Sequence, residues 1–397
     1  MSAPRPVVIA AGGTGGHVVP AIGVAQALAG RGVPVVWIGT AEGLEASLVP
    51  AAGIELRTVE VRGLRGKGAL DRALGPVRLA RAVRRSAALL AELRPRAVLG
   101  MGGYVSGPVG IAARLARVPL VLHEQNAVAG LTNRTLARVA TRTFAAFPGA
   151  FGARVDARTV GNPVTDAVAA LAQRADAHDD AAHGADRPLA LLVVGGSRGA
   201  AALNEALPGA CAALARAGVA LAVRHQAGAG RGAAVREAYA RALAGTGGTV
   251  EAAADDFIDD MPGAYDGSDL VVARSGAMTV TELAAVGRAA ILVPYPHAVD
   301  DHQSANARWL VEAGGALLMP QPLDPVRLAD EIARLAADRG ALRAMGRAAR
   351  ARFVPEAAER VADALLELSG GAAGPSADAS GALADAARVR PVAGEGR

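Results

Sequence analysis

A glycine-rich turn near the N-terminus is followed at once by a residue that can transfer a proton. The turn at residues 12–16 comes after a short apolar run, and His17 opens a helical pattern that continues to Leu28. Glycines let a bulky ligand approach the backbone, and a helix N-terminus favours an anion. Because an imidazole titrates near neutral pH, His17 suits a general base. A histidine that caps its own helix, and a turn that binds no ligand, remain alternatives.

Two later turns carry groups that suit a nucleotide. Residues 195–200 place Ser197 and Arg198 where both could meet a phosphate. Residues 274–282 again follow an apolar run and lead into a helical pattern. Glu282 is expected about one turn into that helix, where its carboxylate can accept hydrogen bonds from two neighbouring ribose hydroxyls. A helix-dipole or capping role is the alternative for this glutamate.

A polar loop at residues 294–306 contains two histidines and two aspartates. These residue types are found in metal sites. The chain has no D-x-D triplet, however, and the histidines and carboxylates of the loop lack a fixed helical spacing. A sugar-binding loop is therefore the better interpretation, and we expect neither a metal nor another cofactor.

Length and composition limit the class of protein. The chain has 397 residues, which at roughly 150 residues per domain predicts two domains, and its 52% hydrophobic residues suffice for sizeable cores. No apolar run reaches the roughly 18 residues of a spanning helix, and the N-terminal stretch is unlike a signal peptide, so the mature protein should begin near Met1. A single cysteine, Cys211, excludes an intramolecular disulfide and a cysteine-based metal cluster, which fits a reducing, cytoplasmic setting.

Short β-branched runs alternate with alanine-rich segments of helical length, which is typical of βαβ units and parallel sheets. The strand candidates begin at Pro6, Val33, Ile54, Ala97, Pro119 and Thr141, and then at Pro188, Val219, Thr249, Asp269, Ala289 and Gly315. We therefore predict an α/β fold with two Rossmann-like, doubly wound domains. The glycine-rich and polar loops all leave the carboxyl ends of strands, so the two loop-bearing edges are expected to face each other across a cleft.

Breaks in this pattern set the expected boundaries. Residues 1–165 form the first domain, and residues 188–355 form the second. Residues 166–187 are expected to be a linker or insertion, because their second part is polar, acidic and without an apolar face. Residues 356–369 are expected to form a C-terminal helix that packs back on the first domain. The small, glycine-rich residues 370–397 are expected to be disordered.

Several motifs of the chain together resemble the MurG family, GT-B-fold glycosyltransferases of peptidoglycan synthesis, from about Val7 to about Leu368. These motifs are, in order, GGTGGHVVPAI, GMGGYVSGP, HEQNAVAGLTNR, VGNPV, GGSRGA, RSGAMTVTEL and PYPHAVDDHQSANA. The resemblance implies transfer of N-acetylglucosamine from UDP-N-acetylglucosamine to undecaprenyl-pyrophosphoryl-N-acetylmuramyl pentapeptide (lipid I), with inversion at the anomeric carbon, to give lipid II. It further implies that the first domain faces the acceptor and the membrane, and that the second binds the UDP-sugar.

The resemblance also assigns the donor site. It implies that Ile258 contacts uracil through its backbone, that Glu282 holds the ribose hydroxyls and that Gln303 reads the hydroxyls of the sugar. The diphosphate would meet Ser197 and the turn formed by Ala277, Met278, Thr279, Val280 and Thr281. From the first domain, the residues that reach the cleft would be Thr14, Gly15, Gly16 and Asn126. The family usually has an arginine where Thr165 stands here, which puts a donor contact at that position in doubt, and Arg198 is a candidate to replace it in part.

The reaction needs a base that takes the proton of the acceptor hydroxyl, and stabilisation of the departing nucleotide diphosphate. Helix N-termini with Ser197 can supply that stabilisation without a metal. His17 and Glu124, the latter in the HEQN motif, are the candidates for the base. Either residue could orient the substrate instead of abstracting the proton.

A segment rich in arginine is the candidate for membrane contact. Residues 62–96 contain ten basic and only two acidic residues, although the whole chain has a net charge of only +5. Leu70, Leu74 and Val77 would give this basic surface an apolar edge, suited to anionic lipid headgroups on the cytoplasmic face of the membrane, where the enzyme would bind peripherally. An ordinary solvated helix face is the alternative. Nucleic-acid binding is disfavoured because only 3% of residues are aromatic and no reader motif is present.

Other functions compete with this interpretation. Another GT-B glycosyltransferase, acting on a secondary metabolite, is the closest alternative, and the HEQNAVAG and GMGGYVSGP motifs argue against it. A Rossmann oxidoreductase would need a third glycine where Val18 stands. A non-catalytic sugar-nucleotide sensor could keep Glu282 and Gln303 but would have no use for a lipid-facing patch. The resemblance also implies cell-wall synthesis and division proteins as further partners.

Overall fold

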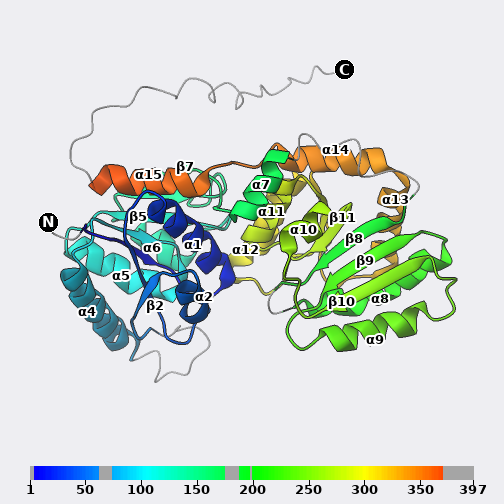
Figure 1. Cartoon of the computed structure of the whole chain (residues 1–397), viewed down its shortest axis with the longest axis horizontal. Coiled ribbons are helices and arrows are strands. Elements are labelled where there is room, and N and C mark those ends of the chain that lie inside the picture. The colour runs from blue at the N-terminus through cyan, green and yellow to red at the C-terminus, as the bar shows by residue number, and fades with distance from the viewer. Residues whose placement is uncertain (1–3, 62–73, 175–186, 197–198, 370–397) are drawn as a thin grey trace, which may run out of the picture.

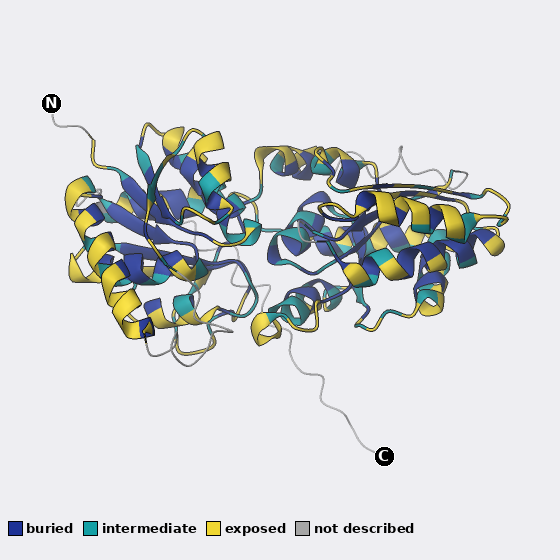
Figure 2. Ribbon diagram, turned by 90° about the horizontal axis from the view of Figure 1, so that it is seen from below, coloured by how far each residue is buried: buried dark blue, intermediate teal, exposed yellow. Residues whose placement is uncertain are grey.

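The computed structural model describes residues 4–61, 74–174, 187–196 and 199–369. These residues form two α/β bodies that lie side by side, each built on one sheet in which all the strand pairs are parallel (Figure 1). The strands are buried and the exposed surface lies mainly on the outer faces of the helices (Figure 2). The predicted fold class, two doubly wound α/β domains, is confirmed.

The N-terminal body has a seven-stranded sheet in the order β3-β2-β1-β4-β5-β6-β7. Its strands are β1 (Val7–Ala10), β2 (Val35–Gly39), β3 (Glu55–Thr58), β4 (Ala97–Gly100), β5 (Leu120–Glu124), β6 (Arg142–Ala145) and β7 (Arg158–Thr159). The central strands β1, β4 and β5 are buried along their whole length, as expected of apolar runs covered by helices on both faces. The order reverses between β1 and β4, so the loops after these two strands lie together at the carboxyl edge.

Helices cover both faces of this sheet. They are α1 (Gly15–Ala29), α2 (Glu45–Ala51), α4 (Gly75–Leu93), α5 (Gly103–Leu115) and α6 (Leu131–Leu136). The last helix of the chain, α15 (Ala357–Ser369), also lies on this body and packs against α1 (Figure 1). Its apolar residues Val361 and Leu365 belong to the same buried cluster as Val24 and Leu28 of α1.

The C-terminal body has a six-stranded sheet in the order β10-β9-β8-β11-β12-β13. Its strands are β8 (Leu189–Val194), β9 (Leu221–Gln226), β10 (Val250–Asp255), β11 (Leu270–Ala273), β12 (Ala289–Leu292) and β13 (Ala316–Leu318). Its helices are α8 (Ala201–Arg216), α9 (Gly232–Leu243), α10 (Met261–Asp266), α11 (Ala277–Val286), the 3-10 turn η1 (Val299–Asp301), α12 (His302–Val311), α13 (Pro325–Ala337) and α14 (Arg339–Arg350). Here the order reverses between β8 and β11, which brings the loop after β11 to the carboxyl edge.

One expectation needs correction. The segment at residues 166–187, expected to be a linker or insertion, begins with a helix, α7 (Asp166–Arg174). Val168, Leu171 and Ala172 of α7 are buried in an apolar cluster of the C-terminal body, so this helix is part of that body. The apolar face of α7 is short and lies in an alanine-rich sequence, so its periodicity is not apparent from the sequence. Outside the described residues lie residues 175–186 of the expected linker, Ser197, Arg198, Leu70 and the expected disordered tail.

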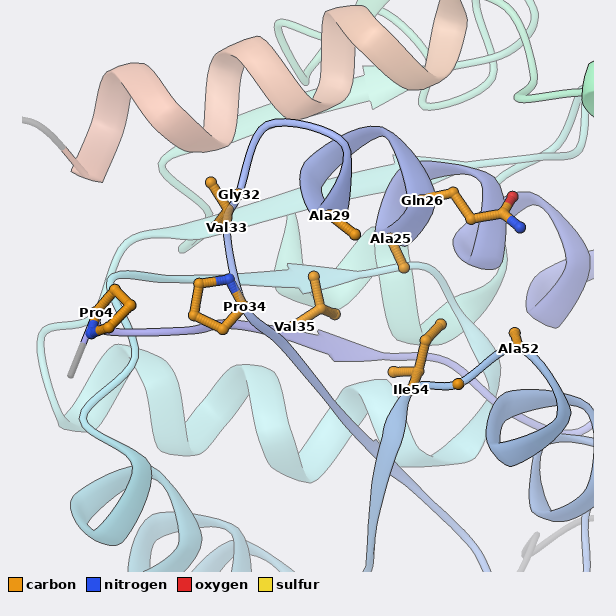
Figure 3. Close-up of a pocket in the computed structure, with 11 residues that line it drawn as sticks. Pro4, Ala25, Gln26, Ala29, Gly32, Val33, Pro34, Val35, Ala52 and Ile54 are labelled. Atoms are coloured by element: carbon orange, nitrogen blue, oxygen red, sulfur yellow. The ribbon is translucent and has the colours of Figure 1, made fainter.

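The structure contains a shallow apolar pocket of about 400 Å³ in the N-terminal body (Figure 3). Residues at the end of α1 and just before β2 and β3 line it, among them Gln26, Pro34 and Ile54. These positions are at the amino edge of the sheet, opposite the loops that carry the expected site. None of the residues predicted to bind substrate lines this pocket. Among the described helices, none is long and apolar enough to cross a membrane.

Candidate active site

The first glycine turn lies between β1 and α1 and is covered by a second turn between β4 and α5. Thr14 is the N-cap of α1 and has extended backbone, but no side chain caps this helix. Gly103 has a φ of +79° and packs so closely on Gly12 that a Cβ would collide with the Gly12 carbonyl. The GMGG motif is thus needed for the close approach of two turns. Uncapped N–H groups at a helix start suit an anionic ligand.

His17 lies in the first turn of α1, half-buried between these two glycine turns. Its Nδ1 is 3.1 Å from Oγ1 of Thr14, and a Cβ on Gly102 would come within 2.8 Å of its Cδ2. Burial lowers the pKa of His17, an effect that Glu124 and Glu45 oppose and that His302 of the other body reinforces. The ring is therefore neutral near pH 7. When Nδ1–H donates to Thr14, Nε2 keeps the lone pair that a base needs.

Glu124, the other candidate base, ends β5 and is 2% exposed. Its Oε1 accepts hydrogen bonds from the backbone and side-chain nitrogens of Asn126, at 3.0 and 3.1 Å. Its Oε2 accepts from Gly130 N at 3.1 Å and from Asn133 Nδ2 at 2.9 Å. These four donors occupy the lone-pair positions of the two carboxylate oxygens. Glu124 is thereby bonded to the loop at residues 125–130, whereas among the described residues no hydrogen bond involves Nε2 of His17.

On the C-terminal body, Glu282 lies in the second turn of α11 and is half-buried. Its Oε2 accepts a hydrogen bond from the hydroxyl of Tyr265 at 3.1 Å. Burial raises the pKa of Glu282 to about 7, and the hydrogen bond from Tyr265 only partly opposes this rise. A carboxylate beyond the first turn, bonded to a tyrosine, does not match the capping alternative. It leaves Oε1 available to a ligand.

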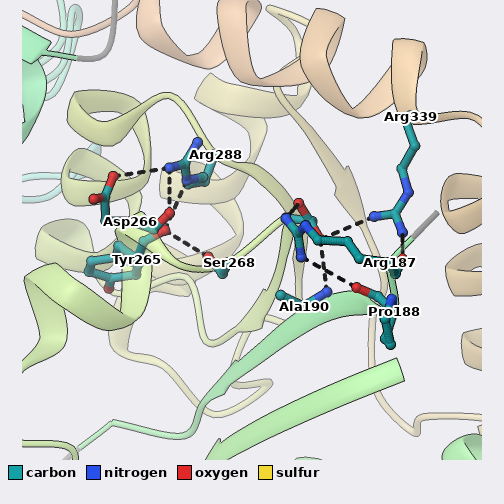
Figure 4. Close-up of polar contacts among 9 residues, drawn as sticks. Arg187, Pro188, Ala190, Tyr265, Asp266, Ser268, Arg288 and Arg339 are labelled. Carbon is teal, nitrogen blue, oxygen red and sulfur yellow. Dashed lines mark hydrogen bonds and ion pairs between the residues drawn. The ribbon is translucent and has the colours of Figure 1, made fainter. Parts of the chain in front are cut away.

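Tyr265 is itself held rigidly. Its backbone oxygen accepts hydrogen bonds from Arg288 Nε and from Ser268 Oγ, both at 2.9 Å (Figure 4). Arg288 also donates to the backbone oxygen of Asp266 at 2.7 Å. The tyrosine side chain is 1% exposed, so neither its ring nor its hydroxyl has room to move away from Glu282.

A separate group of ion pairs, also drawn in Figure 4, fixes the amino end of β11. The buried carboxylate of Asp269 accepts from Arg187 at 2.7 Å, from Arg339 at 3.1 Å and from the backbone nitrogen of Ala190 at 2.8 Å (Figure 4). These contacts tie β11 to β8 and to α14. The strand that carries the turn before α11 is therefore anchored at its amino end.

The other predicted donor residues lie at the carboxyl edge of the C-terminal sheet. Gly276 is the N-cap of α11, which no side chain caps, so residues 277–279 present backbone N–H groups, whereas Val280 N donates to Gly276 O at 2.9 Å. Ile258 follows β10 and is buried. Gln303 accepts a hydrogen bond from Tyr295 N at 2.8 Å through Oε1, which leaves its amide nitrogen as a donor. Thr165 is not hydrogen-bonded to any of these groups. Its exposed hydroxyl oxygen accepts a long hydrogen bond, 3.5 Å, from Val168 N in the first turn of α7.

Two buried asparagines connect the bodies, and no pattern in the sequence predicts their role. Asn306 of α12 accepts from Ala127 N at 2.8 Å and donates to Ser275 O at 3.1 Å. Asn162 donates to Gln125 O and to Thr281 Oγ1, both at 3.0 Å. The two asparagine side chains therefore bridge the loop at residues 125–130 to Ser275, in the turn before α11, and to Thr281 of α11. Both asparagines lie in quoted motifs, VGNPV and HQSANA, but their partners are more than 30 residues away in the chain.

Two parallel α/β bodies, with His17 at the uncapped start of α1 on one and Glu282 in α11 on the other, have the architecture of a GT-B glycosyltransferase. Residues 7–145 match the glycosyltransferase family 28 N-terminal domain, and residues 190–361 match the glycosyltransferase family 28 C-terminal domain. The chain belongs to this family, and within it to the MurG group, as the following relatives show.

Curated relatives match over nearly their whole length. The UDP-N-acetylglucosamine--N-acetylmuramyl-(pentapeptide) pyrophosphoryl-undecaprenol N-acetylglucosamine transferase of Chromohalobacter salexigens is 50% identical over 91% of this chain and 96% of its own length. The enzyme of the same name from Alkalilimnicola ehrlichii is 51% identical, over 91% and 98%. The crystal structure of Acinetobacter baumannii MurG has a TM-score of 0.78 and 38% identity, over 92% of this chain and all of that one. The calicheamicin glycosyltransferase CalG4, at 18% identity and a TM-score of 0.63, shares the fold alone.

Proposed function

We propose that this protein transfers N-acetylglucosamine from UDP-N-acetylglucosamine to lipid I and so forms lipid II. The observation that carries the proposal is that His17 lies at the uncapped start of α1 on one body and Glu282 in α11, which also starts uncapped, on the other, in bodies that Asn306 and Asn162 join beside these elements. The names of the relatives, at about half identity over almost the whole chain, supply the substrates.

The reaction is a single displacement at the anomeric carbon. Nε2 of His17 takes the proton of the acceptor hydroxyl while its oxygen attacks, and the bond to UDP breaks on the opposite face, which inverts the configuration. Negative charge then grows on the diphosphate, and the N–H groups at the start of α11 stabilise it. Glu282 holds the ribose hydroxyls, and the free amide nitrogen of Gln303 donates to the sugar. Asn126, held by Glu124, completes the wall of the site on the acceptor side.

The exposed face of α4 and the end of α5 bind the membrane peripherally on its cytoplasmic side in this proposal. Leu74, Val77, Leu79 and Leu115 are exposed to 42%, 63%, 43% and 70%. Exposed arginines surround them, at positions 78, 81, 84, 85, 114 and 117. The two helices pack side by side (Figure 1), and in this proposal their exposed apolar and arginine side chains together contact the membrane. Such a surface suits anionic headgroups with their upper acyl chains.

The test of the reaction is UDP release from UDP-N-acetylglucosamine with and without a lipid I analogue, in the wild type and in His17→Ala. Release that requires the analogue and is lost in the variant supports both the reaction and the role of His17. Donor binding without acceptor-dependent release would overturn the lipid II assignment, and would favour another GT-B glycosyltransferase.

Membrane binding has its own test. The wild type should sediment with phosphatidylglycerol vesicles at low salt. The double variant with Val77→Asp and Leu115→Asp should remain in the supernatant. Val326→Asp, at an equally exposed valine of the other body, is the matched control and should bind like the wild type. Equal binding of all three proteins would exclude this surface.

A further inference from the structure

A second buried carboxylate lies beneath the first glycine turn. Glu45 is the first residue of α2 and has no exposed surface. Its Oε2 accepts a hydrogen bond from Gly13 N at 3.0 Å, and its Oε1 accepts from Thr40 N at 3.0 Å and from Thr40 Oγ1 at 2.6 Å. The carboxylate thus ties the turn after β1 to the turn after β2, although neither belongs to its own helix.

Three glycines leave the space that this side chain fills. A Cβ on Gly12 would come within 2.5 Å of Oε1 of Glu45, and a Cβ on Gly39 within 2.8 Å of its Cγ. A Cβ on Gly43 would collide with the same carboxylate. Gly12 does not have a positive φ, so the need for glycine there comes from Glu45 and not from the backbone conformation.

We propose that Glu45 is a positioning residue for the transfer reaction, which holds the turn at residues 12–16 and thereby sets the place of His17 and of the uncapped N–H groups of α1. This role rests on the proposed function, in which His17 is the base. Glu45 bonds to Gly13, one residue before the N-cap Thr14, and Thr14 in turn contacts the His17 ring. A shift of the turn would therefore move the base.

The negative charge of Glu45 also supports the proposed role of His17 as the base. Burial opposes its ionisation, but the hydrogen bonds from Thr40 and Gly13 outweigh this effect and lower the pKa of Glu45. The ionised carboxylate in turn raises the pKa of His17. His17 is thus a stronger base than its burial alone would allow.

Glu45→Gln separates this role from simple packing, because it keeps the shape but removes the charge and one acceptor. We expect kcat to fall about tenfold, since a misplaced base loses transition-state contact, while KM for UDP-N-acetylglucosamine changes by less than about twofold. The acid limb of the kcat/KM profile should move to lower pH, because the pKa of His17 falls. Glu55→Gln, at an exposed glutamate of the same body, is the matched control. A wild-type kcat together with an unchanged pH profile would overturn the proposal.

A double-mutant cycle tests the space argument and does not depend on the identity of the base. Gly12→Ala should cost about tenfold in kcat/KM because the new methyl displaces the carboxylate. When Gly12→Ala is combined with Glu45→Ala, kcat/KM should be almost the same as in Glu45→Ala alone. Losses that multiply would overturn the assignment. If Glu45→Ala does not fold, Thr40→Val, which removes only the hydroxyl donor to Oε1, should lower kcat by a smaller factor than Glu45→Gln does, and a wild-type kcat would count against the role.

His17→Ala distinguishes failure of this inference from failure of the proposed function. If His17→Ala keeps wild-type activity, His17 is not the base, and the proposed mechanism fails whatever Glu45 does. If His17→Ala is inactive but Glu45→Gln behaves like the wild type, the mechanism stands and the positioning role is wrong.

Discussion

Glu45 and Glu124 in the N-terminal body differ from Glu282 in the C-terminal body in how completely hydrogen bonds satisfy their oxygens. Glu45 accepts three hydrogen bonds and Glu124 accepts four, mostly from backbone or asparagine nitrogens of neighbouring turns. Glu282 accepts one, from Tyr265, and keeps an oxygen available. All three lie near the carboxyl edges of their sheets, where ligands bind.

The difference separates two uses of a buried carboxylate. A fully bonded carboxylate is already stabilised by the protein, so it fixes loops and gains little from a ligand. A carboxylate with one donor is stabilised poorly, which is why burial raises the pKa of Glu282 to about 7, and a ligand that brings hydroxyls completes it. On this comparison, the proposals give the carboxylates of the N-terminal body a structural role and the carboxylate of the C-terminal body a binding role.

The largest effect is expected from Glu124→Ala. Loss of four hydrogen bonds leaves buried donors unpaired, so we expect the free energy of unfolding to fall by about 3 kcal/mol and kcat/KM to fall about 100-fold as the loop shifts. Thermal unfolding measures the change in stability, and kcat/KM measured across a range of pH gives the loss of activity. Glu124→Gln, which keeps one acceptor oxygen, should lose less. Unchanged stability with loss of the acid limb would instead identify Glu124 as the base.

Glu282→Ala should reveal the opposite behaviour. Because two hydrogen bonds to ribose hydroxyls are lost, we expect Kd for UDP-N-acetylglucosamine to rise about 30-fold, with a change in the free energy of unfolding below about 1 kcal/mol. Calorimetry with the donor alone gives Kd. A 2'-deoxyribose donor should bind the variant and the wild type more equally. If Glu282→Ala destabilises the fold as much as Glu124→Ala does, the comparison fails.

Donor affinity should depend on pH through Glu282. The carboxylate must be ionised to accept ribose hydroxyls, and its pKa is about 7 in the free protein. Affinity is therefore full well above pH 7 and is lost as pH falls below it, by about tenfold at pH 6 relative to pH 8. Calorimetry across this range checks the value. In Glu282→Gln the dependence should disappear, and its persistence there would assign it to another group.

The smallest effect is expected from Tyr265→Phe. Removing the hydroxyl takes away the hydrogen bond that lowers the pKa of Glu282, so this pKa rises further and a smaller fraction of Glu282 is ionised near pH 7. We expect Kd for the donor to rise about threefold at pH 7 and the midpoint of its pH dependence to move to higher pH. Ser268→Ala, which removes a bond to the tyrosine backbone only, is the control. Equal midpoints in Tyr265→Phe and the wild type would contradict the link.

The sequence predicted the two parallel sheets and the motifs of the site because both depend on local patterns. Alternating apolar runs predicted the strands, and the glycine turns after β1 and β11 predicted that His17 and Glu282 lie at the carboxyl edges of the sheets. The short strand β7 and the helix α7 were missed, since neither has a pattern long enough to recognise. The role of Gly12 was read as room for a ligand, and the structure shows that Glu45 fills the space beside it.

The amino-acid sequence by itself determined the fold class, the family resemblance and which residue types meet at the sheet edges. Only the tertiary structure decided which carboxylates are satisfied and which remains available. Glu45 reaches Gly13 across 32 positions, and Asn306 reaches Ala127 across 179. Such bonds depend on the register of the sheets and on how the two bodies pack, because a side chain finds its partner in space. A pattern of neighbouring residues cannot encode that distance.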